Sequence, residues 1–110
     1  MSAETFIAYF GLRFEVDPDE IEGVEGRTDR RVVAARRVGL QCYWGIFGEL
    51  QESYRLFIGA ELGLLGAENK ESINIPLDTL QRRIDITKAK LIEAGFEGAP
   101  SFHLQWEPDI

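Results

Sequence analysis

The stretch TFIAYFGLRFEV, residues 5 to 16, decides the fold because apolar side chains recur at every second position. The odd positions, in contrast, mix polar, aromatic and glycine residues. Successive side chains of a β-strand point to opposite faces of a sheet, so this period of two predicts a long strand with one buried face. The even, apolar positions are Phe6, Ala8, Phe10, Leu12, Phe14 and Val16.

Three later segments alternate with the same parity: residues 38–47, 54–64 and 101–107. Each carries its larger apolar side chains mainly at even positions, which predicts four strands that share one buried face. The link between the second and third segments, residues 48–53, is short and mostly polar. Such a link favours an antiparallel hairpin.

Two stretches do not alternate. Residues 77–94 place apolar side chains at helical spacing, and Gly95 suits the left-handed position that follows a helix. In residues 28–37, Thr28 or Asp29 can cap a short helix, although consecutive valines favour helix only weakly. Residues 17–26 and 66–74 are expected to form loops.

The expected order of elements is therefore β-α-β-β-α-β within a single α+β domain, residues 1–110. This is the order of the ferredoxin-like split βαβ fold, a four-stranded antiparallel sheet with helices on one face. The alternative is another α+β arrangement in which residues 17–37 form no packed helix. Element order alone does not imply a function.

Composition limits the possible partners. The chain has 12 basic and 19 acidic residues and a formal net charge of -7, which works against binding nucleic acid or an anionic membrane. A basic protein partner is compatible with this charge. Cys42 is the only cysteine, and neither a signal peptide nor an apolar run of membrane-spanning length is visible. We therefore expect a cytoplasmic protein.

Glycines gather on the odd face of the predicted sheet, at Gly11, Gly39, Gly45, Gly59 and Gly63. Glycine inside a strand costs roughly 0.5–1 kcal/mol relative to alanine, so five on one face need an explanation. One interpretation is that a ligand, or the sheet of a second subunit, approaches this face closely. The other is that the glycines let the sheet coil and bend.

The same face carries the candidate binding residues. Its polar and aromatic side chains form a set suited to a small polar or anionic ligand, with the only histidine as a possible general base. These candidates are Tyr9, Arg13, Tyr43, Arg55, His103 and Gln105.

Little in the sequence supports nucleophilic catalysis, nucleotide binding or a metal site. Parity places Cys42 on the buried face and His103 on the opposite one, so they are not expected to form a nucleophile–base pair. The chain has no phosphate loop, dinucleotide fingerprint, nucleophile elbow or zinc-protease motif. We expect neither a metal site nor a cofactor.

Five arginines fall between residues 27 and 37, just after an acidic stretch, residues 15–25. A patch for phosphate or nucleic acid is one interpretation. We favour neutralisation by the neighbouring carboxylates, because the chain as a whole is acidic.

These observations lead to a functional hypothesis. The chain is expected to be a non-enzymatic binding or regulatory domain that acts as a homodimer through the glycine-bearing sheet face. One alternative is a small enzyme with a pocket around His103. Another is an acidic inhibitor or immunity-type protein that binds a basic partner.

Overall fold

The computed structural model describes residues 5–47, 53–66 and 71–107 of the chain. They form an α+β fold, in which a four-stranded antiparallel sheet of order β2-β3-β1-β4 is accompanied by helices. The strands are β1 (Thr5–Glu15), β2 (Gln41–Phe47), β3 (Ser53–Gly66) and β4 (Ser101–Glu107). The helices are a 3-10 turn η1 (Pro18–Glu20), α1 (Ile21–Glu25), α2 (Arg30–Arg37) and α3 (Leu77–Glu93). None of the helices in these residues is long and apolar enough to cross a membrane.

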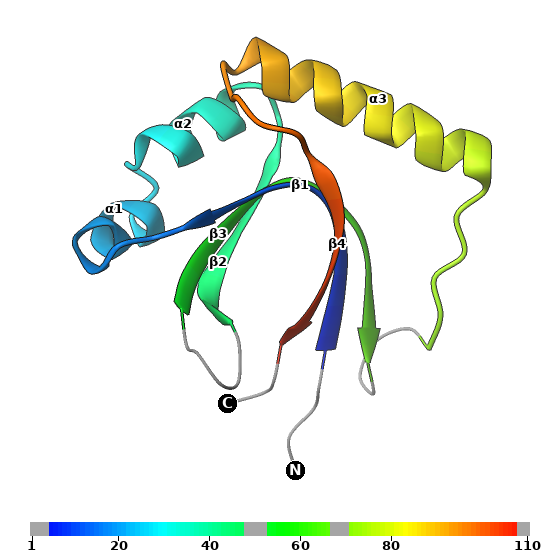
Figure 1. Cartoon of the computed structure of the whole chain (residues 1–110), viewed down its shortest axis with the longest axis horizontal. Coiled ribbons are helices and arrows are strands. Elements are labelled where there is room, and N and C mark those ends of the chain that lie inside the picture. Colours follow the sequence, from blue (N-terminus) through cyan, green and yellow to red (C-terminus); the bar gives the residue numbers. More distant parts are fainter. Residues whose placement is uncertain (1–4, 48–52, 67–70, 108–110) are drawn as a thin grey trace.

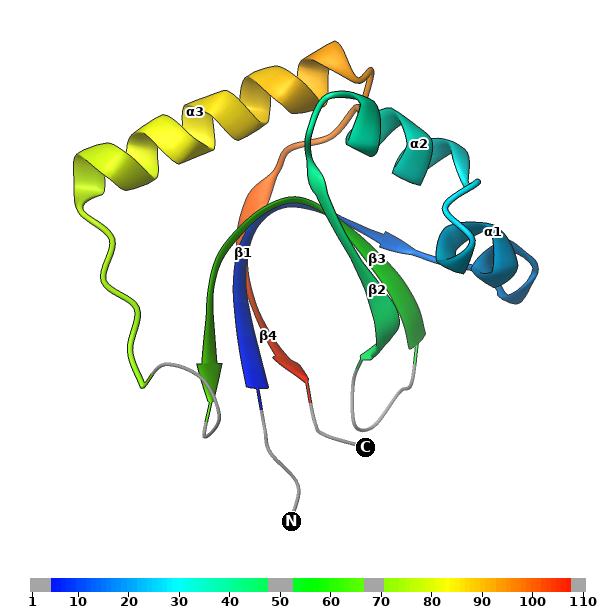
Figure 2. The ribbon, with the colours of Figure 1, turned by 180° about the vertical axis from the view of Figure 1, so that it is seen from behind.

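The sheet is folded into an arch. β2 pairs only with the first half of β3, from Ser53 to Gly59, and β4 pairs only with the first half of β1, from Thr5 to Gly11. The sheet therefore has two three-stranded limbs that share the β1–β3 pair. Figure 1 shows both long strands bending over the top of the arch, with α2 and α3 on its outer side, and Figure 2 shows the same arrangement from behind.

Two glycines make this bend possible. Gly11 and Gly59 are directly opposite each other in the β1–β3 register. A Cβ atom on Gly59 would overlap the Phe10 carbonyl oxygen, and one on Gly11 would overlap the Ile58 carbonyl oxygen. Only residues without a side chain let the two backbones approach this closely. These two glycines therefore serve curvature, one of the two roles expected from the sequence.

The outer face of the arch carries two apolar cores. One lies below α1, α2 and the end of α3, and the other lies below α3 and the segment that leads into it. Buried members of the first are Leu12, Val16, Val24, Val32, Ala35, Leu40, Leu56, Ile58 and Leu91. The second joins Ala8, Phe10 and Leu62 to Ile73, Ile75, Leu80 and Ile84. Most even positions of β1, and those of β3 up to Leu62, do face the helices, as expected, but the helices bury them in two cores rather than one.

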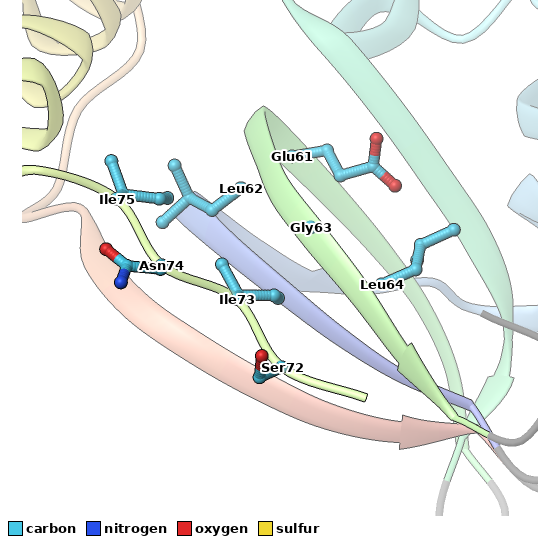
Figure 3. A pocket seen from close by; sticks show the side chains of 8 residues that line it. All are labelled: Glu61, Leu62, Gly63, Leu64, Ser72, Ile73, Asn74 and Ile75. Carbon is cyan, nitrogen blue, oxygen red and sulfur yellow. The ribbon is translucent and has the colours of Figure 1, made fainter. Parts of the chain in front are cut away.

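The parity prediction is wrong at the end of β3. The register shifts between Ala8 and Tyr9, so β3 carries one extra residue at Leu62. An extra residue reverses the faces of all later side chains. Leu64 consequently packs on the inner face of the arch, whereas Gly63 lies on the outer face, where a Cβ would collide with the Ile73 side chain. Figure 3 shows Leu62 on the side of Ile73 and Ile75, with Glu61 and Leu64 on the other side of the strand.

Two further expectations need correction. The second strand begins at Gln41 rather than at residue 38, because Gly39 takes a left-handed φ of 81° and ends α2 in a turn. Residues 17–26 were expected to be a loop but contain η1 and α1. The short helix within residues 28–37 is confirmed, and Asp29 caps it by accepting a hydrogen bond of 2.8 Å from the Arg31 N–H.

Gly59→Ala is expected to destabilise the protein by more than about 3 kcal/mol, because the new methyl group must displace backbone rather than a flexible side chain. Gly23→Ala in α1 is the matched control. Its added Cβ would lie 3.6 Å from the nearest atom, an ordinary contact, and alanine favours helix. Urea unfolding followed by circular dichroism measures both variants. A loss below about 1 kcal/mol for Gly59→Ala would contradict the role of this crossing in the bend.

Candidate functional site

The structure brings four of the six candidate residues together on the inner face of the arch. Tyr9 is directly opposite His103 on β4, and their ring centroids are 5.5 Å apart. Tyr43 lies 6.5 Å from Tyr9 by the same measure. Gln105 lines a small cavity together with Tyr9 and Tyr43. Phe57, which the sequence did not single out as a binding residue, lies between them, 5.0 Å from the Tyr9 ring and 5.9 Å from the His103 ring.

This group forms a packed core rather than an open pocket. Ile7, Tyr9 and Phe57 are buried, with Tyr43 and Leu64 packed against them; we call these five residues the inner cluster. The cavity between them has a volume of only about 10 Å³, roughly the space of one water molecule. The middle of the glycine-bearing face is therefore filled by the chain itself. A ligand or a second copy can reach only its rim.

The Tyr9 hydroxyl is inserted between β1 and β3 at the bend. It donates a hydrogen bond of 2.6 Å to the Leu12 carbonyl, and the hydroxyl oxygen itself accepts a hydrogen bond from the Ile58 backbone. Leu12 and Ile58 are directly opposite each other in the β1–β3 register. Burial is the main cause that raises the pKa of Tyr9 above its ordinary value, so the phenol stays neutral and serves as a structural bridge.

His103 is half-buried at the side of the inner cluster. Its Nε2 lies 3.3 Å from both the Gly11 carbonyl oxygen and the Ser101 hydroxyl. A carbonyl only accepts, so the bond to Gly11 requires the proton on Nε2 and leaves Nδ1 as the basic nitrogen of the neutral ring. Burial lowers the pKa of His103; the Gly11 contact opposes this shift, and the charge of Arg13 adds to it.

The remaining predicted site residues lie on the limb that contains β2, beyond the Gly11–Gly59 pair. Arg13 is exposed, next to Phe57 in register, and Arg55 is opposite Gly45. The Nε atom of Arg55 is buried and has no hydrogen-bond partner in the described part of the chain. All six candidates therefore share one face of the sheet, but the two arginines are not part of the packed group.

The Ser101 hydroxyl is the potential nucleophile beside His103, but Nε2 carries the proton that it donates to the Gly11 carbonyl and so cannot accept the proton of Ser101. Cys42 packs against the outer core, so the sheet separates it from the histidine, as parity predicted. Burial raises the pKa of the Cys42 thiol, which keeps it protonated and unreactive. Across residues 5–47, 53–66 and 71–107, no three His, Cys, Asp or Glu side chains are grouped so that they could hold a metal ion.

The arginine-rich segment is neutralised only in part. Arg31 pairs with Asp29 at 3.0 Å and with Glu20 at 3.3 Å. These contacts lower the pKa of Asp29 and raise that of Arg31. No ion pair joins Arg30 or Arg37 to another described residue, and both line a hollow of about 760 Å³ between α2 and residues 94–96.

A second hollow, of about 460 Å³, lies between the end of β3 and residues 72–75 (Figure 3). β2 does not reach this part of β3, and side chains occupy the open edge instead. The Glu61 N–H donates to Gln41 Oε1 at 2.6 Å, and the Glu61 carbonyl accepts from Arg83. The polar composition of residues 66–74 predicts a loop but does not predict this hollow.

The most exposed apolar surface in the described sheet lies on the outer face of β4. Leu104 is 56% exposed and Phe102 is 60% exposed. Phe6, which is opposite Trp106 on the neighbouring strand, is 37% exposed. Parity assigns these residues to the core, but α3 makes its sheet contacts mainly with β1 and β3, and these side chains stay exposed among the described residues. We call Phe6, Phe102 and Leu104 the β4 patch.

Tyr9→Phe is expected to cost about 1–3 kcal/mol, because it leaves the buried Leu12 carbonyl without the hydroxyl that donates to it. Tyr54→Phe is the matched control, since the Tyr54 hydroxyl donates to Glu25 at the surface, where water replaces it. Chemical unfolding of both variants gives the comparison. Equal losses would show that the Tyr9 hydroxyl does not hold the bend.

His103 is the only histidine, so its ring protons give a single NMR titration. We expect a midpoint below the ordinary value of about 6.5. The unfolded chain then binds the proton more readily than the folded chain does. The stability that the neutral, buried ring contributes is therefore lost as the pH falls from about 6.5 through the folded-state pKa. Arg13→Gln should raise the midpoint and Arg30→Gln should not. An unshifted midpoint in the wild type would contradict the burial of the ring.

Comparison with models of known protein families, with curated proteins and with solved structures finds no match to this chain. What it does must therefore be inferred from its own surfaces and cavities.

Proposed function

We propose that this chain is a non-enzymatic binding or regulatory domain that acts as a homodimer. The observation that supports this function is the β4 patch, whose large apolar side chains stay exposed at the end of the sheet. Contiguous apolar surface of this kind on a soluble domain marks a site of interaction. The inner cluster argues against the alternative of an enzyme pocket around His103, because its cavity has no room for a substrate.

The charge of the chain favours a specific interface over general adhesion. A net charge of -7 keeps separate molecules apart unless a surface of low charge lets them meet. Residues 101–106 provide such a surface, since they contain no Asp, Glu, Lys or Arg. The proposed dimer therefore meets through an uncharged segment of a chain whose net charge is negative.

We also propose that the fold is a variant of the ferredoxin-like split βαβ arrangement. The strand order β2-β3-β1-β4, with helices in the connections from β1 to β2 and from β3 to β4, supports this assignment. The sharp bend of the sheet is the feature in which this chain would depart from a regular member.

The glycine-bearing face stays a second proposal for the interface. Gly45 lies on its rim, opposite Arg55. Gly59, in contrast, cannot serve to test this face, because a side chain there collides with β1 of the same molecule. Gly45→Val is therefore the variant that reports on this alternative.

The homodimer is tested by sedimentation velocity over a range of micromolar concentrations. We expect a concentration-dependent dimer for the wild type and at least about a tenfold weaker dimer for Leu104→Lys, because the change places charge in the apolar patch. Ile92→Lys is the matched control, since Ile92 is 76% exposed on α3. A wild type that stays monomeric at all concentrations would overturn the proposal. Loss of the dimer in Gly45→Val but not in Leu104→Lys would show that the interface is the glycine-bearing face.

A further inference from the structure

We propose that two copies of the chain join edge to edge through β4, in antiparallel register about Leu104, and form one continuous eight-stranded sheet. This inference rests on the proposed homodimer and adds the pairing that holds it together. Three features of β4 support it: the direction of its backbone groups, the symmetry of its side chains, and the absence of charged residues and proline from Ser101 to Trp106.

The backbone direction follows from two contacts. The Trp106 carbonyl accepts a hydrogen bond of 2.9 Å from Gln105 Nε2, a side chain of the same strand. The Gly11 carbonyl, on the neighbouring strand, accepts from His103. Backbone groups alternate in direction along a strand, so Phe102 and Leu104 direct theirs to the same side as Trp106, away from β1. The Phe102 and Leu104 groups are then directed toward another strand, and the Trp106 carbonyl, which already accepts from Gln105, has a second lone pair for such a bond.

The side chains of β4 are arranged symmetrically about Leu104. Antiparallel pairing centred on this residue places it opposite its own copy and places Phe102 opposite Trp106. Aromatic pairs directly across two strands are favourable. On the inner face His103 meets Gln105, and at the ends Ser101 meets Glu107. No two like charges are opposite each other, although the whole molecule is acidic.

In the described residues the edge of β4 is capped only at the Trp106 carbonyl, by Gln105 of the same strand, and no side chain of another element is bonded to it. Beyond the end of β2, the free edge of β3 is capped at Glu61 by the Gln41 and Arg83 side chains. Natural sheets protect their edges with charged residues, proline or bulges. The segment Ser101–Trp106 has none of these residues, and its register with β1 is uninterrupted. An uncharged, self-complementary edge fits a second copy of itself better than an unrelated partner.

The size of this contact sets its strength. Aromatic side chains contribute about 150–250 Å² each when fully buried, so the partly exposed Phe102 and Leu104 on β4 offer roughly 200 Å² per copy. A standard interface buries about 800 Å² per partner. We therefore expect a dimer that dissociates at micromolar concentrations, with β4 as its centre.

Disulfide trapping tests the register. In a Cys42→Ser background, which removes the only native thiol, Leu104→Cys should form a disulfide-linked dimer under mild oxidation. Paired residues lie about 5.5 Å apart between Cα atoms, within disulfide range. Phe102→Cys is the matched control. Its two copies would lie about 14 Å apart, four residues along the strand, and should not link. An equimolar mixture of Phe102→Cys and Trp106→Cys should link, whereas neither variant should link alone.

The outcomes separate this inference from the proposed function. Linkage at Leu104 with none at Phe102 supports the pairing. A wild type that dimerises in sedimentation while Leu104→Cys does not link would overturn the edge pairing but leave the homodimer intact. Linkage of Phe102→Cys with itself would contradict the register. A wild type without any dimer would overturn both.

Discussion

The close crossing of β1 and β3 at Gly11 and Gly59 is the constraint on which the rest of the structure depends. The two backbones approach so closely there that a side chain on either residue would overlap a carbonyl oxygen. Strands that cross in this way cannot remain in a flat sheet, so the sheet divides into two limbs. β2 belongs to one limb and β4 to the other.

The inner cluster holds the limbs at this bend. Tyr9 lies on one limb and Phe57 on the other, and their rings meet at nearly a right angle. The Tyr9 hydroxyl joins the backbone at the crossing itself. Because these aromatic side chains are used for the fold, the inner face holds a packed core with His103 at its side rather than an open binding site.

Bending also determines which surface stays exposed. α2 covers one limb and α3 covers the β1–β3 part of the other (Figure 1), so the helices cannot also cover β4. Apolar side chains that a flat sheet would place beneath helices are left at the surface instead. The exposed apolar side chains of β4 thus follow from the bend at Gly11 and Gly59. We propose that a second copy of the chain pairs with β4 and extends the sheet.

The sequence by itself determined the strands, α3 and the short helix α2, because alternation and capping are local signals that depend on neighbouring residues. It also grouped the candidate side chains correctly on one face. It did not determine the faces at Gly63 and Leu64, since a single extra residue at Leu62 shows only in the register with β1. Nor did it show that Phe102 and Leu104 are exposed. Alternation tells which side chains share a face of a strand, but only the tertiary structure decides whether another element covers that face.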